Sequence, residues 1–171
     1  KDTWFFDKSK TAMGVMAEVY DWCYDLLSKQ DKDFIVAGVV NKLACNLEVD
    51  NPPKNTACVT GHSTSVLTLR DWPAFAVAVA DEYPEIYTHV IGLLENAYAE
   101  APNWYYPSGA NFQGSAYGIN KTHLNILSEY MVYIMSGEKL YAEGVDFERL
   151  IYTYLSYLRP DEESIRIGDD F

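Results

Sequence analysis

Apolar residues recur along this 171-residue chain at intervals of three and four, the period of an α-helix with one buried face. The pattern predicts six helices, over residues 11–28, 32–48, 62–82, 84–100, 115–136 and 146–158. No segment shows the strict apolar–polar alternation of a half-buried strand. Pro84 suits the first turn of the fourth helix, whereas Pro73 lies inside the third and predicts a kink or a break. The expected fold class is therefore all-α.

The lengths of the connections predict how these helices are arranged. Short connections join the first helix to the second, the third to the fourth and the fifth to the sixth, and such pairs are usually antiparallel neighbours. The other two connections, 50–61 and 101–114, are long. We therefore expect stacked antiparallel helical hairpins, as in part of an incomplete α/α toroid. Alternate helices then start on one rim, which carries both long loops.

Two short motifs lie on this expected rim, each where a loop enters a helix. They are Thr60–Ser63, which presents His62, and Gln113–Gly118, which presents Tyr117. A tyrosine has an ordinary pKa of about 10, so it needs a nearby cation to act as a base near neutral pH. Lys121, one helical turn later, can supply that charge. The structural alternatives are a rim tyrosine beside a solvated lysine, and a histidine that only begins a helix.

Aromatic residues make up 15% of the chain, more than a helical core requires. Trp104, Tyr105 and Tyr106 follow one another on the long loop before Tyr117. Exposed aromatic rings commonly line carbohydrate clefts, although tyrosine also packs between helices. We expect at least one of the three to be partly exposed as a sugar platform.

The charge and the remaining side chains exclude several classes of function. A net charge of −12 argues against nucleic acid and anionic membrane surfaces as partners. No apolar run reaches the roughly 18 residues of a membrane span. The histidines do not stand at metal-ligand spacing, so neither a metal site nor another cofactor is predicted. The acidic pairs Asp21/Asp25 and Asp81/Glu82 fit a solvated surface better than a glycosidase pair.

Several segments, taken in order, resemble the helical toroid domain of the heparinase II/III-like polysaccharide lyases. These segments, which span nearly the whole chain, are Val19–Tyr24, Thr60–His62, Arg70–Asp71, Ala80–Glu85, Asn103–Pro107, Gln113–Tyr117, Arg159–Asp161 and Ile167–Asp170.

The resemblance implies β-elimination on a uronate-containing polysaccharide. Tyr117 matches the family's acid/base tyrosine, and His62 matches the residue that neutralises the uronate carboxylate. The substrate-binding residues that we expect are Lys121, Gln113, Trp104, Tyr105 and Tyr106. The heparinase II branch has Glu where this chain has Ser65 and Arg where it has Lys121, so another uronate polymer is as plausible a substrate as heparin.

The family also carries a downstream β-sandwich domain that supplies a second catalytic histidine. Residues 1–171 are then a single helical segment of a larger, secreted or periplasmic protein, and this segment alone is expected to be inactive. Two other interpretations remain open: a non-catalytic glycan-binding helical domain, and a glycoside hydrolase on an α/α toroid, which needs two opposed carboxylates.

Overall fold

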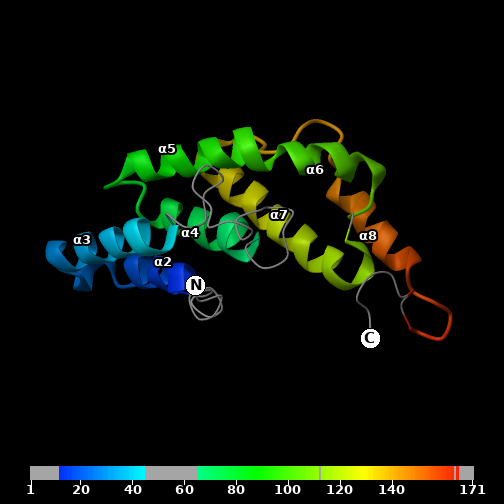
Figure 1. Cartoon of the computed structure of the whole chain (residues 1–171), viewed down its shortest axis with the longest axis horizontal. Coiled ribbons are helices and arrows are strands. Elements are labelled where there is room, and N and C mark those ends of the chain that lie inside the picture. The colour runs from blue at the N-terminus through cyan, green and yellow to red at the C-terminus, as the bar shows by residue number, and fades with distance from the viewer. Residues whose placement is uncertain (1–11, 45–64, 112, 164, 166–171) are drawn as a thin grey trace. The chain divides into compact units, whose positions relative to one another are not determined.

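The computed structural model describes residues 12–44, 65–111, 113–163 and 165. Helices and turns account for these residues, with no β-strand among them, so the all-α prediction is confirmed at this level. The α-helices are α2 (Ala12–Trp22), α3 (Lys29–Gly38), α4 (Trp72–Ala78), α5 (Pro84–Leu93), α6 (Glu100–Tyr105), α7 (Gly114–Ser136) and α8 (Phe147–Ser156) (Figure 1). The chain divides into unit 1, Lys1–Ala97, and unit 2, Tyr98–Phe171.

The first predicted hairpin is present in unit 1, but its turn comes earlier than expected. Helix α2 ends at Trp22, and a short 3-10 turn, Tyr24–Leu26, follows it. Helix α3 then runs back along α2 (Figure 1). The Oγ of Ser28 accepts a hydrogen bond from the backbone N–H of Asp31 at 3.2 Å, and the Asp31 carboxylate accepts from the Ser28 N–H at 3.1 Å. This reciprocal capping box starts α3 at Lys29, three residues before the predicted position.

The third predicted helix changes from π-helical to α-helical geometry just before Pro73, where the sequence predicted a kink or a break. A π-helical segment, Leu67–Asp71, is followed by α4, which places Pro73 in its first turn. Proline has no N–H to donate to an earlier carbonyl, so an uninterrupted α-helix through this position would lose a hydrogen bond and suffer a ring clash. The wider π turn accommodates this change.

The fourth helix begins at Pro84 as predicted, whereas the long loop expected after it is mostly helical. Helix α5 ends at Leu93, and a π-helical segment, Leu94–Tyr98, leads into α6. Much of the expected 101–114 loop is therefore helical, continuing as a 3-10 turn to Ser108. Pro102 does not prevent this, because it lies in the first turn of α6, where backbone N–H groups have no partner within the helix. Gly109, with φ of 76°, ends the turn.

Each unit has its own buried contacts. In unit 1, Tyr20 of α2 packs edge-on against Phe75 of α4 at 6.4 Å between ring centroids, and Trp72 stacks on Phe75 at 6.1 Å. In unit 2, Phe147 of α8 packs edge-on against both Tyr106 and Tyr141. No helix in the described residues is long and apolar enough to cross a bilayer.

Candidate functional site

Tyr117 lies near the start of α7, as the sequence predicted, and its side chain is half-buried. The helix begins at Gly114, and the Gln113 side chain makes no capping hydrogen bond to it. Backbone N–H groups at such an end favour negative charge nearby. The Tyr117 side chain therefore belongs to the first turn of α7.

Lys121 follows Tyr117 by one helical turn and is buried, with 6% of its surface exposed. The solvated lysine of the alternative interpretation is thus not observed. An ammonium group removed from water acts more strongly on its neighbours, because water no longer screens its charge. Spacing of four residues places Lys121 on the same face of α7 as Tyr117.

A buried hydrogen-bond network holds the helix face on which these two residues lie. Asn125 Nδ2 donates to the Tyr106 hydroxyl at 2.8 Å and to the Lys121 carbonyl at 2.9 Å, while its Oδ1 accepts from the Tyr141 hydroxyl at 2.7 Å. The side-chain nitrogen of Asn125 therefore donates two hydrogen bonds, and its oxygen accepts one. Satisfied buried networks make a core rigid.

Tyr106 belongs to this core, which corrects its expected role as a sugar-contacting residue. Its side chain is completely buried, and its hydroxyl accepts hydrogen bonds from Asn125 and, at 3.2 Å, from Asn111. Tyr105 is half-buried, its ring edge-on to Tyr106 with the centroids 4.5 Å apart. Burial also raises the pKa of the Tyr105 hydroxyl above its ordinary value. Tyr106 therefore has no open face for stacking on a sugar, whereas Tyr105 is only partly covered.

Trp104, by contrast, has 83% of its surface exposed. The expectation that at least one of the three aromatic residues is exposed is therefore confirmed. Gln113, also expected to contact substrate, is half-buried, and its backbone N–H donates to Asn111 Oδ1 at 3.0 Å. The side-chain Oε1 of Gln113 is buried without a hydrogen-bond partner. His62 lies outside the described residues, so its expected approach to Tyr117 stays a prediction.

In unit 1, Glu82 of the acidic pair Asp81/Glu82 accepts hydrogen bonds from Tyr20 and Tyr24, about 60 residues earlier in the chain. Sequence reasoning missed Lys29, Lys32 and Asp33, which gather at the same place. Their i, i+3 and i, i+4 spacing on α3 was the available signal, but it matches any solvated helix face.

Comparison with known proteins leaves the family open. No protein-family model, no characterised protein and no solved structure matches this chain.

Proposed function

We propose that this chain is the helical segment of a polysaccharide lyase with stacked hairpins of the α/α toroid type. The enzyme cleaves a uronate-containing polysaccharide by β-elimination, and it is secreted or periplasmic. The observation that carries the proposal is the burial of Lys121 one helical turn after the half-buried Tyr117. The spacing of four residues places this poorly solvated side chain on the same helix face as the Tyr117 phenol, near the start of α7.

In the proposed reaction, the Tyr117 phenolate removes the proton α to the uronate carboxylate. The electron pair forms a carbon–carbon double bond, and the bond to the 4-linked sugar breaks. The Tyr117 phenol, which now holds the abstracted proton, donates it to the leaving oxygen. His62 neutralises the carboxylate, because the intermediate carries extra negative charge on its oxygens. Trp104 provides an exposed ring on which a neighbouring sugar stacks, and Gln113 contacts the substrate through its side-chain amide.

The test uses the full-length protein, with its proposed β-sandwich domain, and a panel of uronate polymers. Elimination leaves an unsaturated uronate that absorbs ultraviolet light, so the product is measured directly. Tyr117→Phe should lower kcat by roughly 10²–10⁴-fold, the usual value of general acid–base catalysis. Tyr133→Phe is the matched control, because Tyr133 lies on the same helix and is 55% exposed. His62→Ala should also be severe, and the 171-residue chain alone should be inactive.

Unimpaired turnover by Tyr117→Phe would contradict this mechanism.

The exposure of Trp104 favours a second candidate, a non-catalytic glycan-binding domain. That protein would bind the polymer and release no ultraviolet-absorbing product, and Trp104→Ala would weaken the binding. Release of reducing ends without ultraviolet absorbance would instead indicate a glycoside hydrolase.

A further inference from the structure

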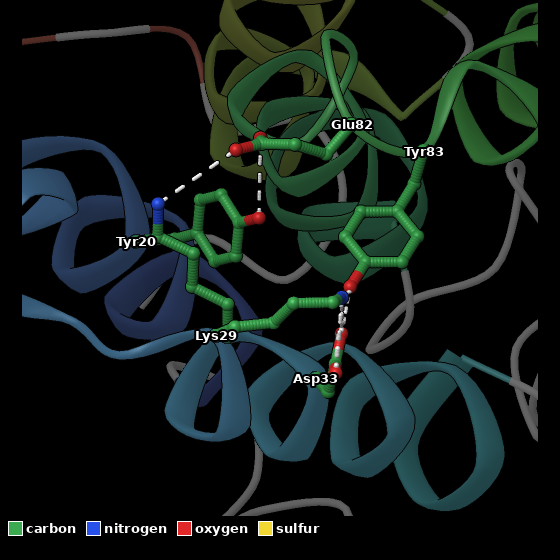
Figure 2. Close-up of a pocket in the computed structure, with 6 residues that line it drawn as sticks. Tyr20, Lys29, Asp33, Glu82 and Tyr83 are labelled. Carbon is green, nitrogen blue, oxygen red and sulfur yellow. Dashed lines mark hydrogen bonds and ion pairs between the residues drawn. The ribbon is translucent and has the colours of Figure 1, made fainter.

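Unit 1 contains a polar pocket of about 350 Å³, and none of its residues takes part in the proposed elimination. The lining side chains come from α2, from α3 and from the turn that precedes α5 (Figure 2). They are Tyr20, Lys29, Lys32, Asp33, Glu82 and Tyr83, which we call the polar pocket. Its volume is within the usual range for small-molecule sites.

Glu82 is the centre of one wall of the polar pocket. Its Oε2 accepts a hydrogen bond from the buried Tyr20 hydroxyl at 3.2 Å, and its Oε1 accepts from the Tyr24 hydroxyl. Lys32 Nζ lies 3.7 Å from Oε1 and 3.0 Å from the centroid of the Tyr24 ring. The carboxylate is therefore fixed from three sides, two of them aromatic.

Asp33 is the centre of the opposite wall. Its two carboxylate oxygens lie 3.0 and 3.1 Å from Lys29 Nζ, and Oδ1 also accepts from the Tyr83 hydroxyl (Figure 2). The hydrogen bond from Tyr83 lowers the pKa of Asp33, and the same bond raises the pKa of Tyr83 to about 12. At neutral pH, Asp33 is thus ionised and Tyr83 keeps its proton.

The charges of the polar pocket decide what it can bind. Two lysines and two carboxylates line it, and each lysine already lies beside a carboxylate. A charged ligand would have to break one of these pairs. A neutral, hydroxyl-rich ligand breaks none, because a carboxylate accepts about four hydrogen bonds, an ammonium donates three and a tyrosine hydroxyl does both. The half-buried ring of Tyr83 offers apolar surface for the C–H groups of such a ligand.

We propose that the polar pocket binds one uncharged sugar residue. Hydroxyl groups of the sugar contact Glu82 and Asp33 on opposite walls, and its C–H face lies against the ring of Tyr83. This site does not depend on the elimination chemistry. It adds a second, independent carbohydrate contact to the chain.

Saturation-transfer NMR on the full chain tests this site with glucose, galactose and mannose as neutral probes and glucuronate and galacturonate as charged ones. We expect at least one neutral sugar to bind with a roughly millimolar Kd, as is usual for a ligand of this size, and to bind more tightly than either uronate. Glu82→Gln should weaken that binding about tenfold, because a charged acceptor is lost. Tyr83→Phe should weaken it to a smaller extent. Asp81→Asn is the matched control, since Asp81 is exposed and adjacent to Glu82 but does not line the pocket.

Circular dichroism of each variant separates lost binding from lost folding, and Tyr83→Phe, which removes only a hydroxyl group, is the milder change. Tyr117→Phe should bind the sugar as the unaltered chain does, which keeps this test apart from that of the lyase. Three results would overturn the proposal. They are absence of binding by every neutral sugar, preference for a uronate, and binding that neither Glu82→Gln nor Tyr83→Phe alters.

Discussion

The hydroxyl oxygen of Tyr154 in α8 lies 2.7 Å from the position that a Cβ atom on Gly118 in α7 would occupy. The Cβ of Asn111 lies 3.2 Å from the same position. Residue 118 is therefore glycine because α8 and Asn111 approach α7 closely at this position. Backbone freedom is not the reason, because α7 is a regular helix there. The absence of a side chain at Gly118 thus lets the start of α7 pack closely against α8.

Gly118→Ala should consequently reverse the usual effect of this substitution in a helix. Alanine normally stabilises a helix interior by about 1 kcal/mol over glycine. Overpacking against Tyr154 and Asn111 costs about 1–3 kcal/mol, so we expect a net loss of roughly 1 kcal/mol in the free energy of unfolding. Urea denaturation measures it.

Gly38→Ala is the control for this prediction. Gly38 is helical, with φ of −64°, and nothing lies within 4 Å of the added Cβ, so this variant should be more stable than the unaltered chain. Tyr154→Phe removes the clashing oxygen and should reduce the cost of Gly118→Ala. Additive effects of the two substitutions would show that the contact does not limit packing.

Asp71 should make unit 1 less stable as the pH rises from about 4 to 7. Burial raises the pKa of its carboxyl above the ordinary 3.8, partly opposed by Arg70, whose Nε lies 2.6 Å from Oδ1, and Glu18 raises it further. The folded state then binds this proton more tightly than the unfolded state does. The stabilisation is fully present below pH 3.8 and is lost as the pH rises through the folded pKa.

Asp71→Asn tests this relationship, because it cannot ionise. The variant should show a smaller fall in the free energy of unfolding across this pH range, as measured by urea denaturation at successive pH values. Asp21→Asn serves as the control on an exposed carboxylate of α2. If the free energy of unfolding of Asp71→Asn changed with pH in parallel with that of the unaltered chain, protonation of Asp71 would not contribute to stability.

Tyr106→Phe should destabilise unit 2 by about 1–3 kcal/mol. The substitution leaves the buried amide groups of Asn111 and Asn125 without the acceptor that the Tyr106 hydroxyl provides. Tyr152→Phe, at a residue that is 70% exposed, should change stability by less than about 0.5 kcal/mol. Thermal unfolding compares the two. Equal stability of both variants would show that the hydrogen bonds of the Tyr106 hydroxyl do not stabilise unit 2.

Trp104→Ala should leave stability within about 0.5 kcal/mol, because the side chain is 83% exposed. It should weaken binding of a uronate polymer by roughly two- to tenfold, since an aromatic contact contributes about 0.5–1.5 kcal/mol. Isothermal titration calorimetry measures the affinity. Trp22→Ala, which removes a tryptophan that is 78% exposed in unit 1, is the control and should bind normally.

Local features of the sequence determined where most helices lie. The apolar period of 115–136 predicted α7 almost to the residue, because Gly137, with φ of 75°, ends the helix where the pattern ends. Pro73 indicated a disturbance of the third helix because it lacks a backbone donor, and the change from π-helical to α-helical geometry lies just before it. The Ser28–Asp31 capping box was also present in the sequence and would have placed the start of α3.

Only the tertiary structure decided what each side chain meets. Trp104 and Tyr106 are two residues apart and chemically alike, yet one is exposed and the other is completely buried. Helical geometry turns such neighbours to different sides, and packing then determines which side is the core. Lys121 is buried although lysine is rarely so. Glu82 accepts a hydrogen bond from Tyr20, which lies 62 residues earlier in the chain. No local pattern predicts this contact, because it depends on how α2 packs against the turn before α5.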